Sequence, residues 1–311
     1  MFSYAILGPL HYLTEINWLR DKNYFIKSKK YWIIPFVIFS IAMVIYPVFS
    51  IIDVGFGNAI LKGVNFIGGQ TNNLLLIGFL FAVSLIFFKK PKNIILALLS
   101  VILISLSINF YLPKTLIFVG LFLPTLVHVY IFTLLFIIYG ALKSNSKYGL
   151  YLGLTLFLVP FIIYYIPIDF VNYKPSQQTL NTFEKSNMQY VSSTIASLFG
   201  ASNNTEFQIL SEIGIRIQVF IAFAYTYHYL NWFSKTSIIG WKKSITKRKA
   251  YLIGFIWILA VSIYMYDFKT GYIALFFLSF LHVFLEFPLN IISIKEIFSL
   301  TRIKRRLVNN S

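Results

Sequence analysis

Apolar stretches of roughly 20 residues recur along almost the whole chain, and about 20 apolar residues are what a helix needs to cross a bilayer. We predict spans near residues 3–19, 31–52, 72–88, 93–111, 115–141, 149–168, 207–233, 250–266 and 271–294. The polar segments between them are too short to fold separately. The chain is therefore predicted to be an all-α, polytopic transmembrane helical bundle of about 8–9 spans, with a single transmembrane domain over residues 1–311.

The composition agrees with this class. Hydrophobic residues make up 58% of the chain and charged residues only 12%, whereas about a quarter of a soluble domain is charged. The formal net charge of +17 would suit a nucleic-acid-binding protein, but the basic residues occur in short clusters between apolar stretches. Such clusters are typical of membrane topology and of contacts with anionic lipid headgroups. We therefore expect membrane lipids, and not nucleic acid, as partners.

Most lysine and arginine residues lie in alternate loops, as the rule that cytoplasmic loops are positive requires. The basic set comprises the loops at about 20–30 and 235–249, two short loops near residues 90 and 145, and the tail at 295–311. The opposite loops hold only Lys62, Lys114, Lys174, Lys185 and Lys269. With nine spans, this pattern places the N-terminus outside and the C-terminus in the cytoplasm.

The longest external segment in this topology is a polar loop at about 167–206. It is the only sizeable polar stretch of the chain. Its pattern predicts a short amphipathic helix near residues 187–199 that lies on the outer surface.

Ionisable side chains inside the predicted spans are the residues most indicative of function, because a charge at the centre of a bilayer costs about 2.5–3.5 kcal/mol on insertion scales. All four histidines of the chain are among them. The set comprises His11 and Glu15 in the first span, His128 in the fifth, Glu212, Arg216 and His228 in the seventh, and His282 and Glu286 in the ninth. Glu212 and Arg216 are four residues apart, which predicts a structural ion pair.

Two histidine–carboxylate pairs have the same spacing. His11 precedes Glu15, and His282 precedes Glu286, by four residues, so each pair lies on one face of a helix. The first, fifth, seventh and ninth spans run in the same direction, and at about 1.5 Å per residue their histidines lie roughly 8–20 Å from the cytoplasmic ends. The sequence thus predicts a shared site inside the membrane.

Four imidazoles and one or two carboxylates suit iron, copper or zinc. Because the chain has no cysteine, thiolate ligands are excluded. We expect His11, His128, His228 and His282 as metal ligands, with Fe²⁺ preferred and copper or zinc as alternatives. Glu15 and Glu286 are then catalytic, as further ligands or as acceptors that orient the imidazoles.

The stretch GPLHYLTE at residues 8–15 resembles the first-helix Gly-x-x-His motif, followed by an acidic residue, of the Brp/Blh family of membrane-bound β-carotene 15,15'-dioxygenases. The resemblance implies an all-helical membrane protein whose histidines hold a catalytic iron and which cleaves a carotenoid to retinal. Only His11 matches the motif as a ligand. Tyr12 stands where the family has a small residue, and Glu15 stands where a second histidine would follow.

The leading hypothesis is an intramembrane metal-dependent oxidoreductase of the oxygenase type that acts on a hydrophobic small molecule, a lipid or an isoprenoid such as a carotenoid. Two other readings stay open. In a proton- or ion-coupled transporter the same His and Glu residues form a relay, with Gly8–Pro9, Pro124 and Pro160 as possible helix breaks. In a noncatalytic scaffold the histidines form hydrogen bonds between helices. The sequence does not decide whether the protein is an enzyme.

Overall fold

The computed structural model describes residues 1–22, 30–52, 57–167, 169, 172–186, 188–198, 208–235 and 240–309. All regular secondary structure in these ranges is helical, so the predicted all-α class is confirmed. Parts of three predicted loops, residues 23–29, 199–207 and 236–239, lie outside the described ranges, as do the side chains of residues 302–311.

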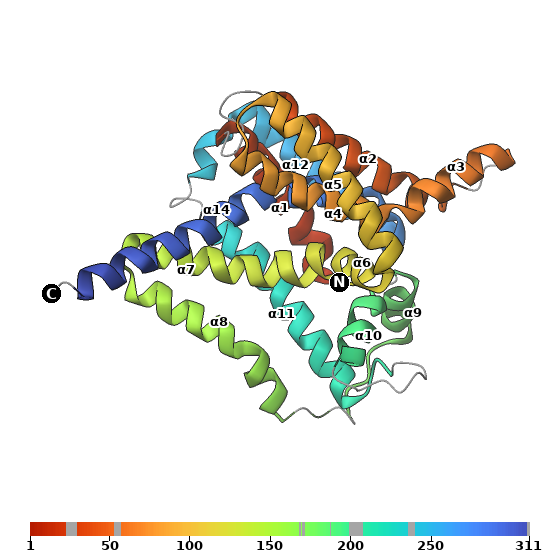
Figure 1. The fold of residues 1–311 in the computed structure, drawn as a ribbon. Helices are drawn as coiled ribbons and strands as arrows, with labels where there is room; N and C mark the ends of the chain where they lie inside the picture. Colours follow the sequence, from red (N-terminus) through yellow and green to blue (C-terminus); the bar gives the residue numbers. More distant parts are fainter. Residues whose placement is uncertain are drawn as a thin grey trace.

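Long helices make up most of the fold (Figure 1). They are α1 (Phe2–Lys22), α2 (Ile34–Phe49), α4 (Thr71–Phe87), α5 (Pro91–Tyr111), α8 (Lys147–Tyr165), α11 (Glu212–Ser234), α12 (Lys247–Tyr266) and α14 (Phe276–Asn309). Shorter helices are α3 (Asn58–Gly69), α9 (Gln177–Lys185), α10 (Gln189–Leu198) and α13 (Phe268–Ala274), with 3-10 turns η1 (Lys30–Ile33) and η3 (Trp241–Ser244). One continuous rod joins α6 (Pro113–Phe122), the π-helical segment η2 (Leu123–Phe132) and α7 (Thr133–Ser144).

Local sequence explains where these helices begin. Pro91 and Pro113 occupy the first helical positions of α5 and α6, where the missing N–H is not needed. Ser211 caps α11 by accepting a hydrogen bond from the backbone N–H of Gly214, and Ser, Thr or Asp caps α8, α9, α12 and α13 in the same way. These caps satisfy backbone donors that the first turn leaves open.

Within the described ranges, six helical segments are long and apolar enough to cross a membrane, and α3 with α4 forms a seventh if the pair, bent by 48°, counts as one span. The six are Tyr31–Phe49, Pro91–Tyr111, Pro113–Ser144, Lys147–Tyr165, Lys247–Tyr266 and Phe276–Thr301. The protein is therefore a multi-pass membrane protein. The predicted first and seventh spans are present as α1 and α11 but carry more polar residues, so the count of 8–9 and the sides of the termini stay predictions.

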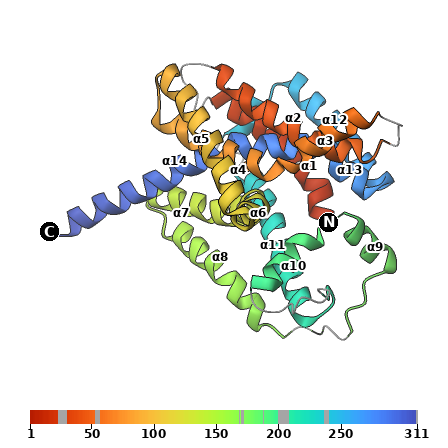
Figure 2. The same cartoon turned by 45° about the vertical axis from the view of Figure 1, so that its right-hand side comes forward.

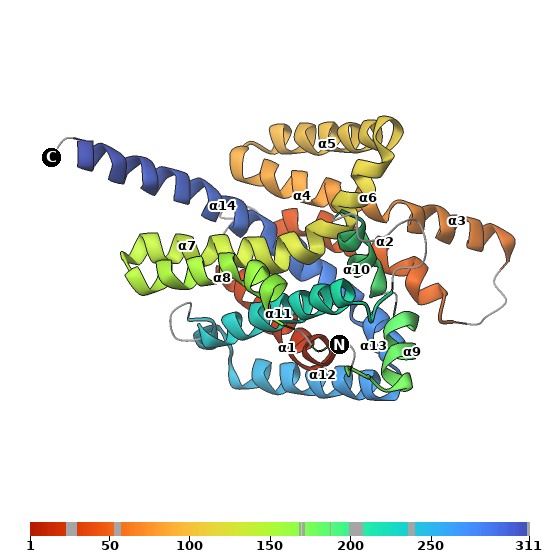
Figure 3. The same cartoon turned by 90° about the horizontal axis from the view of Figure 1, so that it is seen from below.

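Helix α14 is the axis of the bundle. It contacts α1, α2, α4, α7 and η2, and its C-terminal part projects beyond the other helices (Figures 1 and 3). In Figure 3, α4 and α5 lie on one side of α14, and α1 and α12 lie on the other. This central position brings residues of α14 close to most of the other helices.

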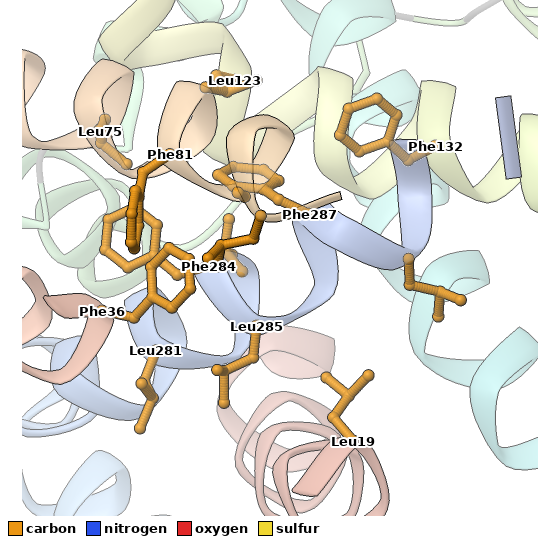
Figure 4. Packing of buried hydrophobic residues seen from close by; sticks show 14 of the residues in the cluster. Leu19, Phe36, Leu75, Phe81, Leu123, Phe132, Leu281, Phe284, Leu285 and Phe287 are labelled. Atoms are coloured by element: carbon orange, nitrogen blue, oxygen red, sulfur yellow. The ribbon is translucent and has the colours of Figure 1, made fainter. Parts of the chain in front are cut away.

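The apolar core gathers around the middle of α14 (Figure 4). Phe284 stacks on Phe36 of α2 with ring centroids 5.8 Å apart, and the edge of Phe79 meets Phe287 at 5.1 Å. Phe284 also reaches Gly78 of α4 so closely that a Cβ there would clash with its ring. The core therefore holds α14 by aromatic packing against α2 and α4.

The two helices of the predicted external segment, α9 and α10, lie together near the N-terminus at one end of the molecule (Figures 1 and 2). The helix predicted near residues 187–199 is present as α10. Its apolar residues Ile195 and Ala196 pack against Ile217 of α11, instead of being left free for a membrane surface. The difference follows from α11, which extends far enough to cover this face.

Candidate metal centre

The four histidines converge in the interior, one each from α1, η2, α11 and α14. All are buried, with exposed fractions between 1% and 6%. Their rings follow one another in a closed ring with centroid distances of 4.6 Å from His11 to His228, 5.1 Å to His128, 5.0 Å to His282 and 5.3 Å back to His11. We call these four residues the histidine ring.

The Nε2 atoms of the histidine ring face one another in two close pairs. The distance is 3.0 Å between His11 and His228, and 3.1 Å between His128 and His282. Two nitrogens that each lie about 2.1 Å from one ion are about 3 Å apart when the bonds meet at a right angle. An N–H···N hydrogen bond has a similar length, so the distances suit either a shared ion or hydrogen-bonded imidazoles.

Hydrogen bonds on the outer side of the histidine ring orient two of the imidazoles. His282 Nδ1 lies 2.5 Å from the backbone oxygen of Ser279, which can only accept, so this Nδ1 carries the proton and the Nε2 lone pair of neutral His282 points inward. His228 Nδ1 lies 2.8 Å from the hydroxyl of Thr133. Second contacts of this kind are what metal-bound histidines normally have.

Two carboxylates complete the set, which we call the His/Glu cluster: the histidine ring with Glu15 and Glu286. Glu15 Oε2 lies 3.0 Å from His11 Nε2, and Glu286 Oε2 lies 3.4 Å from His128 Nε2. Both oxygens are buried, and neither accepts a hydrogen bond of normal geometry. A buried carboxylate without a partner is strongly unfavourable, and a cation between the imidazoles would neutralise it.

Ligand atoms of the cluster fall into two overlapping groups in which every atom lies within 4.8 Å of the others. One contains His128, His228, His282 and Glu286, and the other contains His11, Glu15 and His282. Because nitrogen and oxygen donors without sulfur suit iron, copper or zinc, the residues fit the metals expected from the sequence. The structure thus brings together all six predicted site residues.

His128 has an unusual backbone setting. It lies in η2, a run of ten π-helical residues that begins at Leu123 and has Pro124 as its second residue. Such wide turns are rare and frequently occur at functional sites. The segment ends at Phe132, immediately before Thr133, whose hydroxyl contacts His228. Its course therefore positions both His128 and Thr133.

Aromatic residues hold the histidine ring from one side. Tyr12 stacks on His282 with ring centroids 4.3 Å apart, and its hydroxyl lies 3.1 Å from that of Tyr229. Trp232 donates from Nε1 to Thr14. Sequence spacing does not predict the contacts of Thr133 and Ser279 with the histidines, because both are polar residues without a motif.

Two cavities border the cluster. A cavity of about 880 Å³ is lined by His128, His228 and His282 at one end and by residues of α9 and α10 at another. A much smaller one, of about 30 Å³, is lined by Glu15, Glu286 and Lys235 among others. The carboxylates therefore border the small cavity, while three histidines border the large one.

Glu212 and Arg216 lie away from this cluster and form the predicted ion pair, with 2.7 Å between Arg216 Nη2 and Glu212 Oε1. Arg216 Nη1 also donates to three backbone carbonyls at the end of α8, those of Ile163, Tyr164 and Ile166. The pair thus joins α11 to the C-terminus of α8 and is structural.

Comparison of the chain with protein families, with curated proteins and with solved structures gave no match. The resemblance of residues 8–15 to the Brp/Blh family stays a prediction from the sequence. Its one matched ligand, His11, is a member of the histidine ring.

Proposed function

We propose that the His/Glu cluster binds a metal ion, with iron preferred over copper or zinc, and that the protein is an intramembrane oxidoreductase of the oxygenase type. The observation that carries this proposal is the convergence of four buried imidazoles and two carboxylates, each with a buried Oε2 that accepts no hydrogen bond of normal geometry, beside a large and mainly apolar cavity. In a bilayer, such a set is expensive unless it serves a ligand.

The six residues of the His/Glu cluster would have different roles, depending on where they lie. His128, His228 and His282 with Glu286 would hold an ion in one of the two ligand groups, and His11 and Glu15 with His282 would hold it in the other. Glu15 and Glu286 would bind or balance its charge from the side of the small cavity. The side facing the large cavity would be left for dioxygen and substrate, and an iron ion bound here would supply the activation of dioxygen.

An apolar substrate fits the large cavity. Its walls are mainly Leu, Ile, Val, Phe and Tyr side chains, and its volume lies in the usual range of about 300–1,000 Å³ for small-molecule sites. A lipid or isoprenoid, including the carotenoids implied by the sequence resemblance, would reach it from the bilayer. Incorporation of both atoms of one dioxygen molecule into the substrate balances without another reductant.

Metal content is the first test. Protein purified in detergent without a metal-binding tag should contain stoichiometric iron, or copper or zinc, by elemental mass spectrometry. Alanine at each of the four histidines should lower the content at least tenfold in protein that stays folded, while Glu212→Gln, outside the cluster, should not. Metal retained in all four histidine variants would rule out the site.

The oxygenase reaction needs its own test. Cells that express the protein are supplied with oxygen-18 dioxygen, and their lipid extracts are compared by mass spectrometry with extracts from cells that express His128→Ala. A lipid product that carries the heavy isotope only with the unmodified protein supports the reaction. Identical extracts from the two strains, in hosts that make isoprenoids, would contradict it.

A relay for protons or ions is the second candidate, and the two separate cavities that border the cluster favour it. In that case His and Glu side chains would pass the ion between the cavities. Ion or proton flux into liposomes containing metal-free protein, abolished by Glu286→Gln, would decide for the relay.

A further inference from the structure

Apart from its three histidines, the large cavity has no lysine or arginine side chain among its lining residues in the described ranges, although the chain has 27 lysines and arginines. Its one acidic lining residue, Asp169, is exposed and accepts hydrogen bonds from the backbone and side chain of Asn172. An anionic headgroup would therefore lose its water in the cavity without gaining a cationic side chain, which is strongly unfavourable. The lining selects against phosphate and carboxylate groups.

One hydroxyl in the cavity wall has no partner. Ser192 of α10 lines the cavity, is only 1% exposed, and its Oγ makes no hydrogen bond. Two other threonine hydroxyls of the lining are bonded: Thr125 donates to the carbonyl of Leu121, and Thr226 pairs with Ser3. A buried hydroxyl left open costs about 1–3 kcal/mol, so Ser192 is a candidate contact for a polar group of a ligand.

The contact of α10 with α11 lies about two to three helical turns before His228. Helix α10 packs against Ile217 and Ile221 of α11, and His228 follows Ile221 by seven residues on the same helix. At about 1.5 Å per residue, this places the α10 contact roughly 10 Å from the histidine ring along α11. A ligand that spans the distance has one end at Ser192 and an interior segment at the cluster.

We propose that the large cavity binds an elongated single-chain amphiphile with an uncharged, hydrogen-bonding head group, such as an isoprenoid alcohol, and that Ser192 holds this head group. The apolar chain runs along α11 to the histidine ring. The inference that the cavity binds such an amphiphile rests on the lining of the cavity alone and does not require a bound metal. The further consequence, that the reacting carbon lies within the chain and not beside the head group, rests on the proposed oxygenase function.

Binding of tritiated geranylgeraniol to protein in uncharged lipid nanodiscs tests the proposal, with unlabelled geranylgeraniol and geranylgeranyl phosphate as competitors. The alcohol should compete at least tenfold better than the phosphate. Ser192→Ala should weaken binding of the alcohol about tenfold, the loss expected for one buried hydrogen bond. The matched control is Ser193→Ala, because Ser193 already donates to the carbonyl of Tyr190, and its affinity should not change.

Equal competition by the phosphate, an unchanged affinity in Ser192→Ala, or no binding of the alcohol would each overturn the proposal. Metal content is measured on the same samples. Metal-free protein that binds the alcohol through Ser192 would remove the proposed oxygenase function and keep the binding site. Metal-containing protein that binds the alcohol and the phosphate equally would overturn the proposed head-group site and leave the proposed oxygenase function standing.

Discussion

Two pairs of ionisable residues with the same spacing behave differently in this bundle. Glu212 and Arg216 on α11 are four apart, as are His11 and Glu15 on α1. Arg216 meets Glu212 and the free carbonyls that end α8, so its donors are used. Glu15 Oε2 lies 3.0 Å from the imidazole of His11, is buried, and accepts no hydrogen bond of normal geometry.

The difference shows that spacing alone does not separate a structural pair from a functional one. Both pairs are close along one helix, as their spacing requires. What separates them is the rest of the environment: one pair meets neighbours that complete its hydrogen bonds, and the other faces more histidines and a second carboxylate. The first is complete by itself, whereas the second has donor atoms left over that suit the proposed metal ion.

The largest effect is expected from removing both carboxylate charges of the cluster. The double variant Glu15→Gln, Glu286→Gln should lose metal at least tenfold, because ligand or supporting carboxylates contribute about 10–100-fold to metal affinity. Metal-free protein should unfold at the same or a higher temperature than the metal-free parent, since two buried charges are gone. Elemental analysis measures the metal content, and thermal unfolding in detergent measures the stability. Full metal content in the double variant would contradict a role of the two carboxylates in metal binding.

Disruption of the structural pair, Glu212 and Arg216, is expected to lower stability without lowering metal content. Arg216→Met should lower the free energy of unfolding by about 2–3 kcal/mol, because the carbonyls at the end of α8 and the Glu212 carboxylate lose their donor. Metal content per folded molecule should not change. Unfolding curves in a denaturing detergent give the first value, and loss of metal in this variant would show that the two regions are coupled.

Packing around α14 tests whether the apolar core positions the cluster. Gly78→Ala should cost about 1–2 kcal/mol, because the added methyl group would clash with Phe284. Phe284 lies between His282 and Glu286 in the sequence, so a shifted α14 should also weaken metal binding. Stability and metal affinity are measured together; lost stability with unchanged affinity would show that the cluster keeps its geometry independently of this contact.

The smallest effect concerns Lys235, which lines the small cavity just beyond the end of α11. Burial lowers the pKa of its ammonium group to about 8 from the ordinary 10.5. Between pH values of about 8 and 10.5 the unfolded chain therefore binds more protons than the folded chain. The contribution of Lys235 to the free energy of unfolding rises with pH across this range. Lys235→Met should flatten the rise, as followed by thermal unfolding at several pH values; an unchanged slope would show that the lysine is hydrated.

Much of the candidate site is predictable because it depends on local geometry. The spacing of His282 and Glu286 places both on one helix face whatever surrounds them. The approach of Thr133 to His228 joins residues 95 positions apart, and sequence patterns contain no signal for it. The same holds for η2, whose π-helical form around His128 is not indicated by the apolar run that contains it.

The amino-acid sequence is enough to predict that this protein is helical and rich in membrane-spanning segments, and that its histidines lie on apolar helices. These properties follow from apolar stretches about as long as a bilayer is thick, since the backbone must satisfy its own hydrogen bonds there. Only the tertiary structure decided that the four histidines form one ring, with Ser192 left open along the cavity wall. Those contacts join distant segments, as with the 217 positions between His11 and His228, and they depend on how the helices pack around α14.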